Sequence, residues 1–118
     1  MKEFVLIFRN SANPDFKPSP EQMQQFMTDW MSWMEGMAAD NQLADRGHRL
    51  SMSEACTVQG DGLVTDGPFT EVREFINGYL VVRAETIQEA AVLAGGCPIV
   101  RIGGRVEVRK IVAPDDNS

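Results

Sequence analysis

The sequence holds few of the residues that build metal and redox centres. Its 118 residues include one histidine, His48, and two cysteines, Cys56 and Cys97. Metal ions are usually held by three or four such ligands at short spacing, and carboxylates alone form only weak oxygen sites. We therefore predict no metal. We expect both cysteines to be reduced thiols without a catalytic role, because neither has an evident histidine partner.

Long apolar runs are also missing. The apolar runs, such as residues 4–8 (FVLIF), fall far short of the ~20 residues that a helix needs to cross a bilayer. The first residues, MKEF, include an acidic side chain and lack the apolar core of a secretory signal. We expect a cytoplasmic protein that does not associate with membranes.

Positive charge is scarce and scattered. The formal net charge is −6, whereas a nucleic-acid-binding surface needs clustered cations to neutralise phosphates. The most basic stretch, residues 101–110, is interrupted by Glu107. The glycine pairs at 95–96 and 103–104 fall at a predicted helix end and a predicted turn, so neither forms a phosphate-binding loop. We predict no direct nucleic-acid contact and no cofactor.

The first clear elements are an apolar strand and an amphipathic helix. Every residue at 4–8 is apolar, which predicts a strand that is covered on both faces. Ser19, Pro20 and Gln22 together are typical of a capped helix start. Large apolar side chains then recur every three or four residues up to Ala39. This spacing predicts a helix whose methionine- and tryptophan-rich stripe packs in the core.

The rest of the chain alternates between short strands, turns and one more helix. The triplet at 60–62 (GDG) is typical of a tight hairpin turn, and Thr86 with Glu89 forms a second helix-capping box. In chain order we predict a polar connection at 40–53 with a short strand near 49–52, strands at 54–59 and 63–65, a turn at 77–78, a strand at 79–84, a helix at 87–94, a strand at 105–112 and a frayed tail at 114–118.

This order of elements is typical of one α+β domain, residues 1–113, folded as a ferredoxin-like sandwich. Both helices would then lie on one face of an antiparallel sheet and leave the other face open. Because the strand at 4–8 is apolar on both sides, that other face needs a cover of its own. We therefore predict a homodimer in which two sheets meet face to face as a dimeric α+β barrel.

The segment 65–74 (TDGPFTEVRE) is the most distinctive motif. Its glycine and proline restrict the backbone to a defined turn, and Asp66 can accept backbone N–H bonds within that turn. Glu71 and Arg73 follow in a dense group of charges. The motif fits two interpretations: a rigid turn braced by ion pairs, or part of a functional site.

The same segment, followed by residues 78–79 (GY), resembles the signature of the DGPF, or YCII-related, family. Residues 89–90 (EA), 97–98 (CP) and 106–109 (VEVR) add to the resemblance, which extends over nearly the whole chain. It implies a ferredoxin-like fold paired as a dimeric α+β barrel, as in muconolactone isomerase-like and antibiotic monooxygenase-like proteins. It implies no agreed activity, although a histidine and an aspartate lining a cleft suggest that some members are enzymes.

This chain departs from the family pattern at two places. Its first predicted helix has no histidine, and His48 lies in the polar connection instead. Where relatives commonly carry a lysine in the motif, this chain has Arg73, which keeps the charge and adds a bidentate fork. Related chains also occur beside extracytoplasmic sigma factors, which implies a link to transcription.

Two hypotheses for function follow. In the first, a small molecule with an anionic group binds in the barrel cleft, where carboxylates act as acid or base and arginines hold the anion. The candidate acid/base residues are Asp66 and Glu71, and the candidate ligand-binding residues are Arg73, Arg109, Glu107 and His48. In the second hypothesis, the chain is a noncatalytic module that binds a regulatory ligand or a protein partner.

Overall fold

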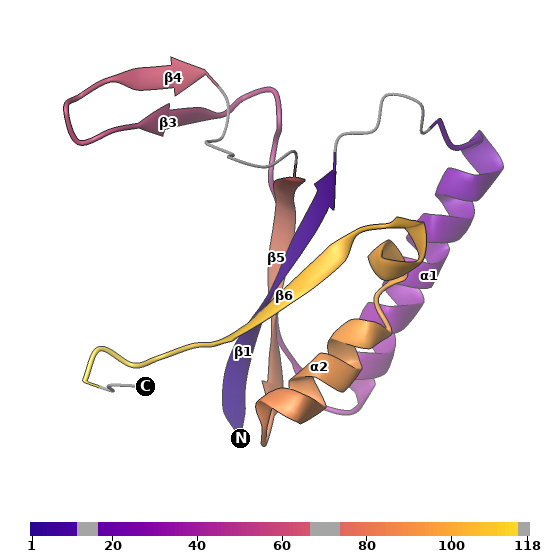
Figure 1. Cartoon of the computed structure of the whole chain (residues 1–118). Helices are drawn as coiled ribbons and strands as arrows, with labels where there is room; N and C mark the ends of the chain where they lie inside the picture. The colour runs from indigo at the N-terminus through magenta and orange to yellow at the C-terminus, as the bar shows by residue number, and fades with distance from the viewer. Residues whose placement is uncertain (12–16, 67–73, 116–118) are drawn as a thin grey trace.

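The structure is a computed structural model that describes residues 1–11, 17–66 and 74–115 (Figure 1). Its elements, in chain order, are β1 (Lys2–Ser11), α1 (Pro20–Ala39), β2 (Leu43–Arg49), β3 (Cys56–Val58), β4 (Val64–Asp66), β5 (Glu74–Ala84), α2 (Ile87–Gly95), the 3-10 helix η1 (Pro98–Ile102) and β6 (Arg105–Lys110). Strands β2, β5, β1 and β6 form an antiparallel sheet in that order. The chain is therefore α+β, an arrangement compatible with the predicted ferredoxin-like fold.

Helix α1 begins at the predicted cap. The Ser19 hydroxyl accepts the backbone N–H of Gln22 at 3.1 Å, and the Gln22 side chain accepts the backbone N–H of Ser19 at 2.8 Å. These bonds satisfy donors that a helix start would otherwise leave without partners. Further along α1, the Trp33 indole donates to the Leu93 carbonyl of α2 at 2.9 Å. This bond links the two helices on one face of the sheet (Figure 1).

The core lies between these helices and one face of the sheet. Strand β1 contributes Phe4, Leu6 and Phe8, which are almost fully buried. The other buried core residues are Met34, Met37, Leu80, Val82, Ala84, Ala90, Ala94, Cys97 and Ile99. The helices and the central strands β1 and β5 thus share one apolar cluster, which fixes the positions of the elements that carry the open side of the sheet.

The methionine-rich stripe of α1 is divided between core and surface. Met34 and Met37 are buried, whereas Met23 and Met27 each keep nearly half of their surface exposed. The first turns of α1 lean away from the sheet (Figure 1), which leaves those two side chains without a core to enter. The prediction that the whole stripe packs in the core is therefore wrong for these two residues.

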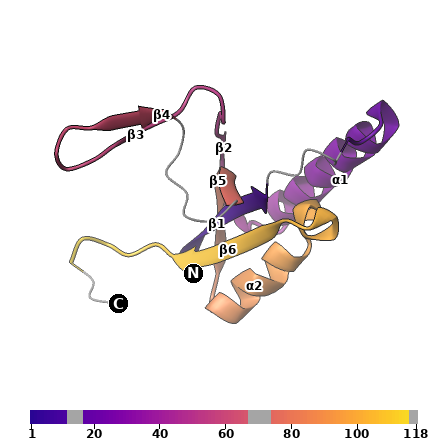
Figure 2. The same cartoon turned by 45° about the horizontal axis from the view of Figure 1, so that its top comes forward.

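Strand β1 is apolar on both sides, but the described residues of the chain cover only one of them. Both helices lie on the side of the buried β1 residues (Figures 1 and 2). Val5 and Ile7 alternate to the opposite side and remain half-buried. We call that side of the sheet, which also bears Tyr79 and Val81 of β5, the open face.

The edge strand β2 spans Leu43–Arg49, so the prediction of a short strand near 49–52 is wrong. Its polar, glycine-containing sequence (LADRGHR) does not alternate, because the register against β5 shifts twice along its length. Each shift adds residues to β2 that have no direct partner. Local sequence patterns therefore do not reveal the strand.

The predicted turn at 77–78 is also wrong, because these residues lie inside β5. The register between β1 and β5 shifts at Phe8/Arg9, which leaves Asn77 as an extra residue in the ladder. The Asn77 carbonyl accepts the backbone N–H of Leu50 at 2.8 Å, so the chain stays hydrogen-bonded at the bulge. An Asn-Gly pair here forms a bulge within a long strand.

The hairpin predicted around 60–62 is confirmed as β3 and β4, which pair with each other in a separate sheet. It projects away from the four-stranded sheet (Figure 2). The second helix and the closing strand are also confirmed, within two residues of their predicted ends. Most of the distinctive motif, residues 67–73, and the end of the predicted tail, residues 116–118, lie outside the described residues.

Strands β2 and β5 approach each other closely at a pair of glycines. Gly47 has φ of +66°, and a Cβ there would overlap the carbonyl oxygen of Tyr79. A Cβ on Gly78 would lie 2.6 Å from the carbonyl oxygen of His48. Asp45 Oδ1 accepts the Gly47 N–H at 2.7 Å, which supports the left-handed backbone. This crossing holds His48 beside Tyr79.

Replacement of Gly47 by alanine is expected to destabilise the fold strongly, because the new Cβ meets the Tyr79 backbone and alanine is strained at positive φ. We expect the free energy of unfolding to fall by about 3 kcal/mol or more, measured by urea denaturation followed by circular dichroism. The control is Gly62→Ala, at φ +86° with open space around it, which should cost about 1 kcal/mol. Equal losses would contradict the close approach of the two strands.

Candidate functional site

Three of the candidate residues from the sequence lie on the open face. Glu107 and Arg109 are two residues apart on β6, and His48 is on β2. Because paired residues in a sheet point to the same side, pairing with Ile7 places Glu107 on the open face. Pairing with Tyr79 does the same for His48. The structure thus brings Glu107 and Arg109 together and sets His48 at the opposite edge.

The other three candidates are not placed on this face. Asp66 ends β4 in the separate hairpin, where it pairs with Cys56, and only its backbone is described. Glu71 and Arg73 lie outside the described residues. The acid/base roles of Asp66 and Glu71 and the binding role of Arg73 therefore stay predictions.

Cross-strand register arranges the open face in rungs. From β2 to β6, the first rung is His48, Tyr79, Ile7 and Glu107. The next rung, in the same order, is Asp45, Val81, Val5 and Arg109. Each rung has two aromatic or aliphatic residues at its centre and one polar or charged residue at each edge. In these two rungs the open face has an apolar centre between two polar margins, whereas the rungs beyond them place Arg9 at one end and Glu3 with Arg83 at the other on the central strands.

At the β6 margin, a carboxylate lies between two arginines. Arg9 Nε donates to Glu107 Oε1 at 3.0 Å, and Arg109 Nη1 lies 3.6 Å from Glu107 Oε2. The Arg9 and Glu107 side chains are 30% and 35% exposed, whereas Arg109 is 70% exposed. We call Arg9, Glu107 and Arg109 the arginine cluster. Because each guanidinium carries five N–H donors, the cluster keeps donors for a further anion.

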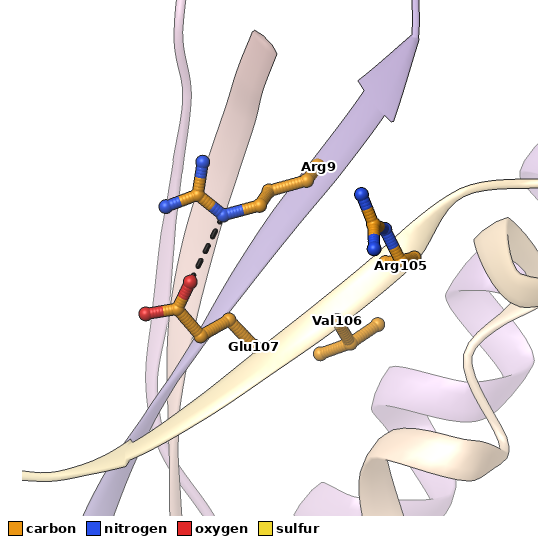
Figure 3. Close-up of a pocket in the computed structure, with 4 residues that line it drawn as sticks. All are labelled: Arg9, Arg105, Val106 and Glu107. Atoms are coloured by element: carbon orange, nitrogen blue, oxygen red, sulfur yellow. Dashed lines mark hydrogen bonds and ion pairs between the residues drawn. The ribbon is translucent and has the colours of Figure 1, made fainter. Parts of the chain in front are cut away.

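A shallow pocket of about 290 Å³ lies at the arginine cluster, lined by Arg9, Arg105, Val106 and Glu107. Figure 3 shows Arg9 reaching from β1 to Glu107 on β6, with Arg105 near them. Guanidinium groups that project from neighbouring strands are suited to bidentate recognition of a carboxylate or a phosphate. The chemistry available at this margin is anion binding.

At the β2 margin, His48 and Tyr79 form a hydrogen-bonded pair. His48 Nδ1 and Tyr79 Oη are 2.9 Å apart, and the tautomer of the imidazole decides which of the two donates. His48 is exposed and Tyr79 is half-buried. A solvent-reachable imidazole beside a phenol can pass a proton to or from a bound molecule. The chemistry available at this margin is proton transfer and hydrogen bonding.

A single chain does not bring the two margins together. Neighbouring strands of a sheet lie about 4.8 Å apart, so the backbones of His48 and Glu107 are separated by roughly 14 Å across the rung. The apolar side chains of Ile7 and Tyr79 lie between them. A small molecule held at the arginine cluster would therefore not reach His48 of the same chain.

Sequence reasoning missed Arg9 and Tyr79, although a signal for Arg9 was present. Arg9 continues the two-residue alternation of Val5 and Ile7 along β1, which places it on the same face. Tyr79 was assigned only as a strand residue. Its contact with His48 depends on the pairing of β2 with β5, and no local pattern reports that pairing.

The two cysteines lie in different surroundings. Burial raises the pKa of the Cys97 thiol to about 11, against the smaller opposing effects of a hydrogen bond with the Ile99 backbone and the charge of Arg101. Cys56 is exposed on the hairpin.

In the described parts of the chain, no three His, Cys, Asp or Glu side chains gather to hold a metal ion. No helix there is long and apolar enough to cross a membrane.

We expect only Cys56 to react with a chromogenic disulfide reagent in the native protein at pH 8, because Cys97 is then buried and protonated. Absorbance should report one reactive thiol per chain in the native state and two after unfolding in guanidinium chloride. The Cys56→Ser variant is the control and should show no fast reaction. A fast native reaction of that variant would show that Cys97 is accessible to the reagent.

A family model matches the chain over nearly its full length. The family model described as the YCII-related domain matches residues 4–113, a range that includes both helices and both margins of the open face. No curated protein matches the chain. The resemblance drawn from the motif at 65–74 is thus confirmed over nearly the full length, and the chain belongs to the YCII-related family.

Proposed function

We propose that this protein binds a small anionic molecule at the arginine cluster, within a homodimer whose open faces close on each other as a dimeric α+β barrel. The observation that carries the proposal is the placement of Arg9, Glu107 and Arg109 on the face of the sheet that the described residues leave uncovered. Arginines at a solvent-facing apolar surface contribute little to the stability of the fold. Anion recognition is the chemistry that suits them best.

Glu107 supports this role by holding the two arginines side by side. Its two carboxylate oxygens contact one guanidinium each, so both groups are preorganised before a ligand arrives. Preorganisation lowers the entropy that ligand binding must overcome. An incoming carboxylate or phosphate can then take the remaining N–H donors in a bidentate arrangement. Closure by a second subunit would exclude water and strengthen these contacts.

The shape of the chain supports the homodimer. Its radius of gyration is 16.0 Å, whereas a compact chain of this length is expected to have about 13.5 Å. The excess comes from an open sheet and a projecting hairpin (Figure 1). On that hairpin, Val58, Leu63 and Val64 keep more than half of their surface exposed. Isolated two-stranded hairpins are marginally stable in water, so a second subunit would supply the missing contacts.

Any chemistry on the bound molecule would use the remaining polar groups of this region. The His48–Tyr79 pair offers proton transfer on the same face. Asp66 and Glu71 are our proposed carboxylate acid/base groups, with Arg73 as a further anion contact. Binding is the function that the described residues support, and a reaction would be built upon it.

Substitution of the clustered arginines is expected to weaken anion binding. We expect the wild-type protein to bind benzoate or inorganic phosphate in isothermal titration calorimetry. Arg109→Gln should raise Kd about tenfold or more, because the loss of a hydrogen bond between charged groups costs about 1.5–3 kcal/mol. Arg9→Gln should act in the same direction.

The matched control is Arg101→Gln, because Arg101 is an exposed arginine that pairs with Asp29 of α1 at 3.2 Å, away from the open face. Its Kd should equal that of the wild type. The circular dichroism spectrum and the melting temperature of each variant check that it is folded. An equal Kd for Arg109→Gln and Arg101→Gln, or no binding of either anion by the wild type, would contradict the proposed function.

A further inference from the structure

In the two rungs described above, the edge residues of β2 and β6 have complementary groups, because Asp45 lies in the rung of Arg109 and His48 in the rung of Glu107. The β6 margin holds the arginine cluster, in which two guanidinium groups share one carboxylate and leave an excess of positive charge. The β2 margin holds Asp45, which is exposed, beside His48 and Tyr79. A surface with opposite charges at its two ends and an apolar centre can pair with a second copy of itself.

The rungs of the open face allow one simple pairing. A two-fold axis parallel to the strands reverses the order of the strands and keeps each rung level with itself. Under this operation Tyr79 lies over Ile7 of the partner subunit, and Val81 lies over Val5 of the partner subunit. The apolar centres of the two sheets therefore meet, as in aligned sheet packing about 10 Å apart.

The same operation brings opposite charges together at the margins. Asp45 faces Arg109 of the partner subunit in one rung, and His48 faces Glu107 of the partner subunit in the other. Because the dimer is symmetric, each of these contacts occurs twice. No like charges of the two margins meet in this arrangement.

A two-fold axis perpendicular to the strands is less favourable. It would set β6 of one subunit over β6 of the other and bring together two arginine clusters, each with excess positive charge. Like-charge contacts across an interface cost several kcal/mol. It would also set each edge strand against its own copy in the other subunit. The parallel axis instead sets β2 of one subunit against β6 of the other, so that each edge strand shields the other.

We propose that two copies of this chain pair about a two-fold axis parallel to the strands, so that each arginine cluster is completed by Asp45, His48 and Tyr79 of the partner subunit. The two margins, about 14 Å apart within one chain, then meet between chains. Each of the two sites is composite, with anion recognition from one subunit and the proton-transferring pair from the other. This inference rests on the homodimer of the proposed function, but not on its ligand.

A charge exchange tests the pairing. Asp45→Arg and Arg109→Asp should each weaken the dimer at least about a hundredfold, because each replaces two opposite-charge contacts by two like-charge contacts. The double variant Asp45→Arg with Arg109→Asp should restore the wild-type dimerisation constant to within a few-fold. Sedimentation velocity over a dilution series measures all four proteins.

The control for the charge exchange is Arg101→Asp, which breaks an ion pair with Asp29 on the helix side and should leave dimerisation unchanged. The pairing is overturned if the single variants dimerise like the wild type, or if the double variant remains weakened. Asp45 and Arg109 are both exposed, but Asp45→Arg also removes the acceptor of the Gly47 N–H, so circular dichroism and the melting temperature of each variant verify that it is folded before dimerisation is compared.

Cross-linking gives a second measurement that does not depend on charge repulsion. In a Cys56→Ser background, chains with Asp45→Cys and chains with Arg109→Cys are mixed and treated with a short bismaleimide. The parallel axis predicts a cross-linked dimer in the mixture and little in either protein alone. Cross-linking of Arg109→Cys chains by themselves would indicate the perpendicular axis and refute the proposed pairing.

The ligand and the pairing can fail separately. If the single variants weaken the dimer and the double variant restores it while neither benzoate nor phosphate binds, the proposed pairing is supported and the proposed anion binding is contradicted. If the anions bind and Arg109→Gln raises their Kd while the double variant does not regain the wild-type dimerisation constant, anion binding at the arginine cluster is supported and the proposed pairing is contradicted.

Discussion

The position of β1 between β5 and β6 is the constraint on which the rest of the structure depends. Its side chains alternate, so Phe4, Leu6 and Phe8 enter the core while Val5 and Ile7 face away from the helices. A shift of one residue in its pairing would exchange the two sets. The burial of three large side chains opposes such a shift. The core thereby fixes the register that arranges the open face.

Elements with local chemical signals could be predicted from the sequence. The Ser19 cap, the apolar run at 4–8 and the turn at 60–62 each depend on neighbouring residues, and each is found where it was expected. The face shared by Glu107 and Arg109 also follows from their spacing alone, because side chains on a strand repeat every two residues. The motif at 65–74 led to the family, which the comparison over residues 4–113 confirms.

The remainder depends on contacts between distant parts of the chain. Arg9 and Glu107 are 98 positions apart in sequence, and their contact exists only because β1 and β6 are neighbours. Strand β2 was missed because its two register shifts remove the alternation by which strands are recognised. The Asn77 bulge gave a false turn signal for a similar reason, since a residue that suits a turn also suits a bulge. Sequence patterns report local geometry, and this surface is assembled from long-range register.

The polar margins give the open face a property that its apolar centre lacks. In the proposed dimer, contacts among Val5, Ile7, Tyr79 and Val81 would supply buried area, but aliphatic surfaces tolerate more than one relative orientation. Charges at the edges would discriminate between orientations, because a wrong one brings like charges together. The bulged, glycine-containing β2 suits this task, since its irregular edge resists uncontrolled strand pairing while Gly47 holds His48 at the margin. The irregularity that hid β2 from sequence analysis is thus the feature that places His48 beside Tyr79 at the edge of the open face.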